Sequence, residues 1–89
     1  GIVRVDERAR RIWFTAQGRE AGRDPYFSHL YRVNFDGRGL TLLTPENAHH
    51  NAQLSPDARF IVSSHSTPNT PTVTVLRDAN GRVLRELER

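Results

Sequence analysis

Apolar and polar side chains alternate in short stretches along this sequence, and turn residues separate one stretch from the next. The clearest case is the segment 29–35, in which every second residue, beginning with His29, shares one face of an extended chain. A period of two is typical of a half-buried β-strand, whereas the 3.6-residue period of an amphipathic helix has no convincing match in this chain. The pattern therefore predicts an all-β protein.

Eight strands are predicted from these stretches and from their β-branched and aromatic residues. Asp36-Gly37 and Asn80-Gly81 predict tight hairpins, because Gly readily adopts the positive φ that these turns require. The segment 17–27, rich in Gly and charge, predicts a loop, and the two prolines of 67–71 predict a stiff one. The predicted strands lie near residues 2–5, 11–16, 29–35, 40–43, 50–54, 59–65, 72–77 and 82–87.

The two halves of the chain share a sequence pattern. Residues 36–43 and 80–87 both read [DN]-G-R-x-L-x-x-L, 44 positions apart, and the run 11–14 resembles the run 59–62. A repeat of about 40 to 50 residues with four strands per unit is typical of β-propeller blades. The pattern predicts two consecutive four-stranded antiparallel blades, in residues 1–45 and 46–89. A small eight-stranded β-sandwich is the alternative.

Composition narrows the class of protein. With 89 residues, of which 36% are hydrophobic and 26% charged, the chain has the size and character of one small globular unit. It has no Cys, which excludes a disulfide framework, a zinc–thiolate site and a cysteine nucleophile. The net charge of +3 comes from Arg residues scattered among ten acidic ones, so we expect no nucleic-acid partner. No apolar run approaches the roughly 20 residues of a membrane span, so we expect no membrane partner.

The boundaries of the chain predict an incomplete assembly. It begins at Gly1 and contains no Met, so we expect a segment of a longer protein, either an artificially bounded piece or a proteolytic remnant. Two blades cannot close a propeller ring, and each blade normally buries both faces against neighbours. The segment alone should therefore expose apolar faces and self-associate.

The stretch 48–57, AHHNAQLSPD, gathers histidines, a serine and an aspartate. On a strand, however, His49 and His50 point to opposite faces, so we expect no metal between them. The same geometry separates Ser64 from His65, and the chain has no Gly-x-Ser-x-Gly elbow to expose a nucleophile. The Gly-containing run 18–22 lacks the Lys-Ser/Thr of a phosphate-binding loop. We therefore expect no catalytic residue, metal or cofactor in this chain.

Aromatic residues offer two further candidates. Trp13 and Phe14 are adjacent on a predicted strand, and we expect both to be buried against flanking blades rather than to form a platform for a ligand. Tyr26 and Phe27 follow Pro25 in the predicted loop. They are candidates for an interface with a neighbouring domain or subunit, and the alternative is local packing over the blade.

Several runs of residues carry a family resemblance over nearly the whole chain. In the first half they are Val5-Asp6, Ile12-Trp-Phe-Thr-Ala16 and His29-Leu-Tyr-Arg32. In the second half they are Leu43-Thr-Pro-Glu46, His50-Asn-Ala-Gln-Leu-Ser-Pro-Asp57, Arg59-Phe-Ile-Val62, Ser66-Thr-Pro-Asn-Thr-Pro71 and Val73-Thr-Val-Leu-Arg-Asp-Ala-Asn-Gly81. Together they resemble the N-terminal β-propeller of dipeptidyl peptidase IV-like serine peptidases, of the prolyl oligopeptidase family. Bacterial members, in a late blade, are the most similar.

The resemblance implies that this segment has a non-catalytic role. Enzymes of that family release dipeptides from peptide N-termini with a Ser-Asp-His triad in a separate α/β-hydrolase domain. Neither the nucleophile motif nor the paired glutamates that hold the substrate amino group occur here. We expect the propeller to restrict access, with His50 near the central channel. The resemblance favours a periplasmic or secreted location, and a cytoplasmic one is the alternative. The alternative function is a TolB-like propeller scaffold that binds protein partners.

One position departs from the usual propeller pattern. The Ser-Pro-Asp turn is commonly followed by Gly, whereas Ala58 stands there in this chain. A left-handed conformation costs Ala about 1 kcal/mol more than it costs Gly. We therefore expect a type I turn in which Ala58 needs no positive φ.

Overall fold

The computed structural model describes residues 1–22 and 24–88, so residue 23 of the predicted loop 17–27 lies outside the description. No helix that could cross a membrane occurs in the described part of the chain. The elements are β1 (Ile2–Asp6), β2 (Arg11–Gln17), β3 (Ser28–Asn34), β4 (Thr41–Leu42), β5 (His49–Leu54), β6 (Phe60–Thr67), β7 (Thr70–Asp78) and β8 (Val83–Glu88).

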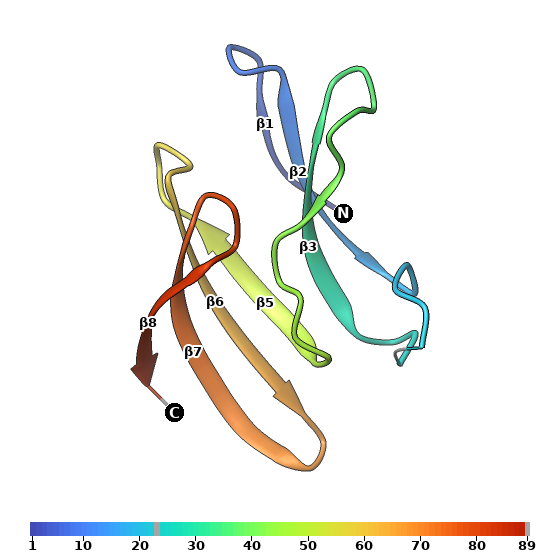
Figure 1. Ribbon diagram of the computed structural model, residues 1–89, viewed down its shortest axis with the longest axis vertical. Helices are drawn as coiled ribbons and strands as arrows, with labels where there is room; N and C mark the ends of the chain where they lie inside the picture. The colour runs from blue at the N-terminus through green and yellow to red at the C-terminus, as the bar shows by residue number, and fades with distance from the viewer. Residues whose placement is uncertain (23, 89) are drawn as a thin grey trace.

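The strands form two antiparallel sheets of four strands each, in the orders β1-β2-β3-β4 and β5-β6-β7-β8. The sheets lie side by side, and the segment after β4 leads directly from one to the other (Figure 1). The all-β prediction of two four-stranded antiparallel sheets is confirmed. Within each sheet every strand pairs with its neighbour in sequence, as in propeller blades, whereas the sandwich alternative commonly has Greek-key connections.

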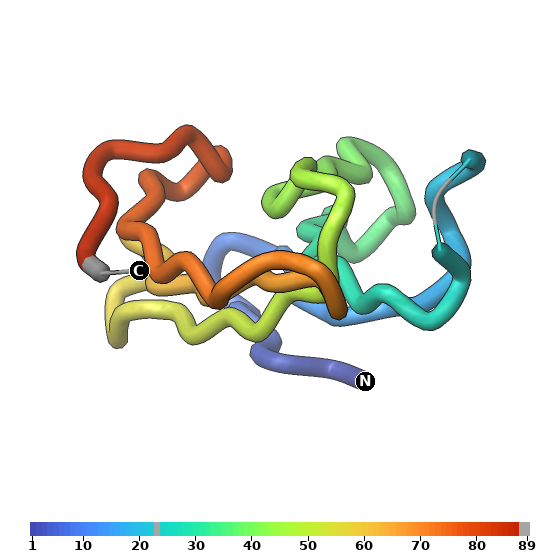
Figure 2. Tube along the Cα trace, turned by 90° about the horizontal axis from the view of Figure 1, so that it is seen from below, coloured from blue at the N-terminus to red at the C-terminus, as the bar shows by residue number. Residues whose placement is uncertain are grey.

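The sequence repeat is a repeat of backbone geometry as well. In the first sheet the amide of Asn34 donates to the carbonyl of Arg38 at 2.9 Å, and in the second Asp78 donates to Arg82 at 2.9 Å. Each hairpin contains a left-handed glycine, with φ of 83° at Gly37 and 88° at Gly81. The segments that follow β3 and β7, green and red in Figure 2, rise on the same side of the two sheets. The same four-strand unit therefore occurs twice.

The turn after Ser-Pro-Asp differs from the prediction. Ala58 has a φ of 59°, so the expectation of a turn without positive φ is wrong. The turn is closed by hydrogen bonds: the Asp57 carboxylate accepts from the Ser55 hydroxyl at 2.7 Å and from the Arg59 amide at 3.1 Å. Arg10, which immediately precedes β2, has a φ of 57°. The reversal before the second strand of each sheet therefore uses a left-handed residue, at a cost of about 1–2 kcal/mol.

The predicted stiff loop at 67–71 is shorter in the structure. β6 continues to Thr67 and β7 begins at Thr70, and these two residues pair across the turn. Pro71 thus lies inside a strand. It is tolerated because β8 pairs with β7 only from Thr74 onward, so the missing N–H of Pro71 removes no bond to β8.

The core lies between the two sheets. It is formed by Trp13, Leu30, Leu43 and Ile61, each at most 3% exposed, with partly buried Ala52, Leu54 and Ala58 against them. Full burial of an aliphatic side chain stabilises the fold by about 1.5–3 kcal/mol. Trp13 is buried as predicted, whereas Phe14 is half-buried and stacks on Tyr31 with ring centroids 5.3 Å apart. The two sheets are therefore packed against each other through the repeat-related positions 13 and 61.

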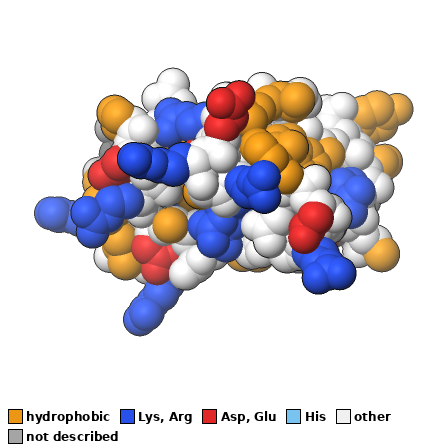
Figure 3. Space-filling view, turned by 90° about the horizontal axis from the view of Figure 1, so that it is seen from above, with side chains coloured by type: hydrophobic (Ala, Val, Ile, Leu, Met, Phe, Trp, Pro, Cys, Tyr) orange, Lys and Arg blue, Asp and Glu red, His pale blue; other side chains and the backbone are white. Residues whose placement is uncertain are grey.

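The outer strands expose apolar side chains. On β1, Ile2 is 71% exposed, and on β8, Leu84 and Leu87 are 49% and 48% exposed. One face of the molecule shows apolar groups beside scattered arginines and acidic residues (Figure 3). These two strands are edge strands of their sheets, and apolar side chains of this kind suit contacts with further blades of a longer propeller.

Candidate functional site

Three histidines meet at the junction of the two sheets. His50 on β5 and His65 on β6 are direct cross-strand partners, and their ring centroids lie 5.1 Å apart. The ring of His29, on β3 of the first sheet, also lies 5.1 Å from that of His50. His29 and His50 are 2% and 3% exposed, and His65 is half-buried. This cluster of three tilted rings therefore joins both sheets in a site that is largely shielded from solvent.

Hydrogen bonds to carbonyl groups define the protonation of two of these rings. Nδ1 of His29 lies 2.8 Å from the carbonyl oxygen of Thr44, and Nε2 of His50 lies 2.9 Å from that of Glu46. A carbonyl oxygen can only accept, so each of these nitrogens carries the proton. The other nitrogen of each ring, and Nδ1 of His65, are buried without a partner among the described residues. Each of the three rings thus has one buried nitrogen without a hydrogen-bond partner in the described part of the chain.

A buried ion pair lies beside the histidines. Arg77, fully buried on β7, donates from Nη2 to Oε1 of Glu46 at 2.7 Å and from Nη1 to Oε2 at 3.3 Å. Its Nε donates to the Ser63 hydroxyl at 2.8 Å, and Nη1 also donates to the Gly81 carbonyl at 3.0 Å. The guanidinium thus fixes the carboxylate of the inter-sheet segment against the second sheet.

Polar contacts and burial shift the pKa values of Glu46 and His50 in opposite directions. Burial opposes ionisation of Glu46, but the hydrogen bond to Arg77, its own backbone amide and the nearby positive charge outweigh it and lower its pKa. Burial lowers the pKa of His50 from 6.5 to about 4, although its bond to the Glu46 carbonyl acts in the opposite direction. At neutral pH the site therefore holds an ionised carboxylate next to a neutral imidazole.

Glu46, His50 and His65 each offer a donor atom within 4.8 Å of the others. Carboxylate oxygen and imidazole nitrogen are the ligand types that divalent transition metals bind in proteins. A groove lined by Glu46, Ala48, His65, Pro71 and Val73 opens beside them. Among the described residues, these three side chains form the group that could hold a metal.

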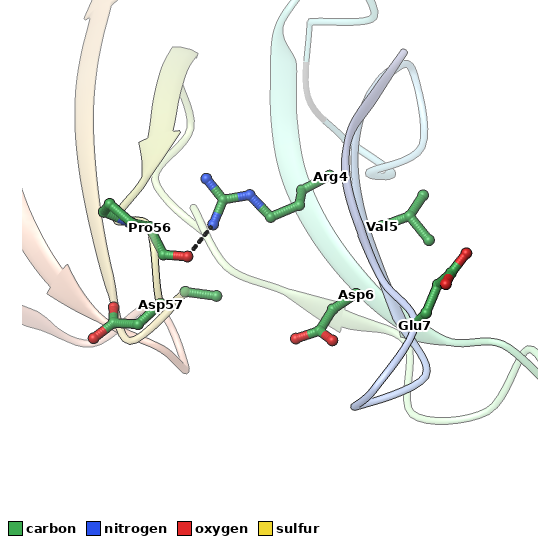
Figure 4. Close-up of a pocket in the computed structure, with 7 residues that line it drawn as sticks. Arg4, Val5, Asp6, Glu7, Pro56 and Asp57 are labelled. Carbon is green, nitrogen blue, oxygen red and sulfur yellow. Dashed lines mark hydrogen bonds between the residues drawn. The ribbon is translucent and has the colours of Figure 1, made fainter.

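A second region lies between β1 and the turn that follows β5. Arg4 reaches from β1 across a groove and donates from Nη1 to the carbonyl of Pro56 at 3.3 Å (Figure 4). The same nitrogen donates to the carbonyl of Ser55 at 2.6 Å. On the same side of the first sheet, Arg32 donates to the carbonyl of Ala79 at 2.7 Å. Both arginines connect one sheet to turns of the other, so we assign this region to inter-sheet packing rather than to ligand binding.

The other residues singled out in the sequence lie apart from the histidine cluster. His49 is exposed and accepts a hydrogen bond from the amide of Ser28 at 3.0 Å, on the face of β5 opposite to His50. Tyr26 is 80% exposed, whereas Phe27 is half-buried. The Ser64 hydroxyl lies 3.2 Å from that of Thr74. Among the described residues, no hydrogen bond joins a serine hydroxyl to a histidine ring.

Sequence reasoning found His50 but missed its partners. It compared His50 with its neighbour His49, whereas the relevant residue is His65, across the hairpin. The signal was present: with a turn at 55–58, the register that pairs Leu54 with Ile61 also pairs His50 with His65. Arg77, Glu46 and His29 have no comparable local signal.

The comparison with protein families identifies one match. The profile described as Dipeptidyl peptidase IV (DPP IV) N-terminal region matches residues 1–72. The match covers the first sheet, β5, β6 and the beginning of β7. Among curated proteins, no sequence matches this chain.

Proposed function

This chain belongs to the family of dipeptidyl peptidase IV N-terminal regions, and on that premise we propose that it is a non-catalytic segment of a propeller that shapes peptide access to a separate hydrolase domain. The parent protein is then a serine-type exopeptidase that releases N-terminal dipeptides. The observation that carries this proposal is the family match over residues 1–72, on a chain that folds as two consecutive four-stranded meanders.

The hydrogen bonds made by the serine and histidine side chains support a non-catalytic role. The hydroxyls of Ser55 and Ser63 are engaged with Asp57 and Arg77, at 2.7 and 2.8 Å. Histidines 29 and 50 donate to backbone carbonyls. A nucleophilic serine needs a base within hydrogen-bond reach, and these residues instead stabilise turns and the inter-sheet junction. The chemistry of the parent therefore belongs to another domain.

Rigidity between the sheets supports the access role. The core at Trp13 and Ile61, and the bonds of Arg4 and Arg32 to turns of the second sheet, hold the two sheets in one orientation. A ring of such sheets would admit short or extended peptides and exclude folded proteins. In a propeller the first strand of a blade lies nearest the central passage. We therefore propose that β5 borders the passage, with His50 anchoring the strand and its exposed residues, 49, 51 and 53, facing the solvent.

A size-selection experiment on the full-length parent tests the proposal. The same N-terminal Gly-Pro dipeptide is presented on a chromogenic group, on an unstructured peptide and on a compactly folded protein. We expect release from the first two and at least tenfold slower release from the third. The folded protein after denaturation serves as the control, and its cleavage should recover. Equal rates on all three substrates would contradict a role in restricting access.

The alternative is a TolB-like scaffold that binds protein partners and performs no chemistry. Exposed Tyr26 and the apolar side chains of β1 and β8 favour it, because such surfaces suit contacts between proteins. Reading the parent gene downstream separates the two functions. A Gly-x-Ser-x-Gly motif within a few hundred residues supports the peptidase, and further Ser-Pro-Asp repeats without it support the scaffold. A periplasmic or secreted location is part of either proposal.

A further inference from the structure

We propose that Glu46, His50 and His65 form a binding site for one divalent transition-metal ion, with zinc the best-suited ion. The site lies between the segment that joins the sheets and the hairpin of β5 and β6. It is independent of the peptidase role, which requires no metal in the propeller. Four observations carry the proposal: the donor set, the ring spacing, the unpartnered nitrogens and the support of the carboxylate.

The donor set has the chemistry of known zinc sites. Two imidazoles and one carboxylate, with water as the remaining ligand, constitute an open tetrahedral zinc site. Donor atoms of all three residues already lie within 4.8 Å of one another. Ligands bound to a single ion at about 2.0–2.2 Å are about 3–4 Å apart, so the side chains must move closer by about 1 Å. The His50 nitrogen that lies 3.9 Å from Oε1 of Glu46 is Nε2, so binding through Nδ1 also requires that the His50 ring or the Glu46 side chain rotate. The backbone does not have to rearrange, because β5 and β6 already pair His50 with His65.

The arrangement of the rings agrees with shared coordination. The centroids of His50 and His65 are 5.1 Å apart, and the ring planes are inclined by 39°. Two imidazoles bound to one tetrahedral zinc, with Zn–N bonds of about 2.0–2.1 Å, have their centroids about 5 Å apart. The spacing between the two rings therefore already has the value that coordination requires.

The hydrogen bonds of His50 follow the outer-shell pattern of a metal ligand. Metal-bound histidines commonly donate the second ring N–H to a carboxylate, a backbone carbonyl or a water. Nε2 of His50 donates to the Glu46 carbonyl at 2.9 Å, which leaves Nδ1 with a free lone pair. Nδ1 of His50 and of His65 are both buried without a partner in the described chain. A metal ion would satisfy these buried nitrogens, which are otherwise unfavourable because burial removes their hydrogen bonds to water.

Arg77 supports the carboxylate without occupying all of it. Each carboxylate oxygen has two lone pairs, so Oε1 of Glu46 can accept from Arg77 at 2.7 Å and still bind a cation. The side chain of Glu46 is 35% exposed and lines the groove beside His65. The groove supplies a route of entry and room for the water ligand. The ring of His29, 5.1 Å from that of His50, packs against it and helps to hold it in position.

Zinc stoichiometry in the full-length protein tests the proposal. The chelator-treated protein is dialysed against buffered free Zn²⁺, and bound zinc is counted by elemental mass spectrometry. We expect the wild type to bind one more zinc per chain than His65→Gln, or to bind that zinc at least tenfold more tightly. His49→Gln is the matched control, because His49 lies next to His50 but is exposed on the opposite face. It should retain the wild-type stoichiometry.

Two results would overturn the site. One is equal zinc binding by wild type and His65→Gln; the other is an equal loss in His49→Gln. Should His65→Gln fail to fold, X-ray absorption of the zinc-loaded wild type decides instead. Two imidazoles in the zinc shell, at about 2.0–2.1 Å, would support the site. A shell without histidine would exclude it. Neither readout depends on peptidase activity, so failure of the metal site and failure of the proposed function can be told apart.

Discussion

The guanidinium of Arg77 lies 2.7 Å from the carboxylate of Glu46 and joins the third strand of the second sheet to the segment that enters that sheet. Arg77 is fully buried, whereas Glu46 is 35% exposed. A buried guanidinium without a carboxylate is strongly unfavourable. The pair therefore fixes the path of the chain from one sheet to the next.

Replacement of Glu46 by Gln should destabilise the chain by about 2–4 kcal/mol, because it leaves a buried positive charge unpaired. Urea unfolding followed by the fluorescence of Trp13, the single tryptophan, measures the change. Asp36→Asn is the control. It removes an ion pair with Arg38 whose side chains are 87% and 61% exposed, and should cost less than about 1 kcal/mol. Similar decreases in the free energy of unfolding of both variants would contradict the role assigned to the pair of Arg77 and Glu46.

The two hairpin glycines should respond differently to Ala. Gly37 and Gly81 both have positive φ, so each substitution costs about 1 kcal/mol for backbone conformation. A Cβ at Gly37 would meet no atom within 4 Å, whereas a Cβ at Gly81 would collide with the backbone of Leu43. Gly81→Ala should therefore lower the free energy of unfolding by at least about 2 kcal/mol more than Gly37→Ala in the same unfolding experiment. Equal losses would mean that the turn at Gly81 does not pack on the inter-sheet segment.

Acid should destabilise the metal-free protein through His50. Its pKa is about 4 when folded and 6.5 when unfolded, so between these values the unfolded state binds a proton that the folded state does not. Stability contributed by the neutral ring is complete above pH 6.5 and falls as the pH decreases toward 4, by about 3 kcal/mol in total. NMR titration of the His50 ring in the presence of a chelator measures the folded pKa. A midpoint near 6.5 would contradict this burial effect.

The isolated 89-residue chain should self-associate. Ile2 on β1 and Leu84 and Leu87 on β8 are about half exposed or more, and exposed apolar side chains favour contacts between copies of the chain. Sedimentation velocity over a hundredfold range of concentration should show a rising sedimentation coefficient. A concentration-independent monomer with a sharp, high-temperature melting transition would count against two blades of a larger ring.

Much of the fold could be predicted because its signals are local. The alternation in 29–35 and the glycines at 37 and 81 locate strands and turns through the chemistry of single residues and their neighbours. The left-handed φ of Ala58 was not predictable in this way, because it follows from the closure of the whole turn by Ser55 and Asp57. Local propensity there favoured the opposite conformation.

The candidate metal site could be predicted only in part. The pairing of His50 with His65 follows from the hairpin register, once the turn is known. The approach of His29 and the ion pair of Arg77 with Glu46 join positions 15 or more residues apart on different elements. Contacts of that kind depend on how one sheet packs on the next, which no local pattern in the sequence specifies.

Hydrolysis of a Gly-Pro chromogenic substrate, by the full-length parent and by this chain alone, tests the central claim most directly. We predict dipeptide release by the parent, its loss on reaction with a serine-directed inhibitor, and no release by the 89-residue chain. Hydrolysis by the isolated chain would contradict its assignment as a non-catalytic segment. A folded but inactive parent without a serine nucleophile would contradict the peptidase assignment and favour the scaffold.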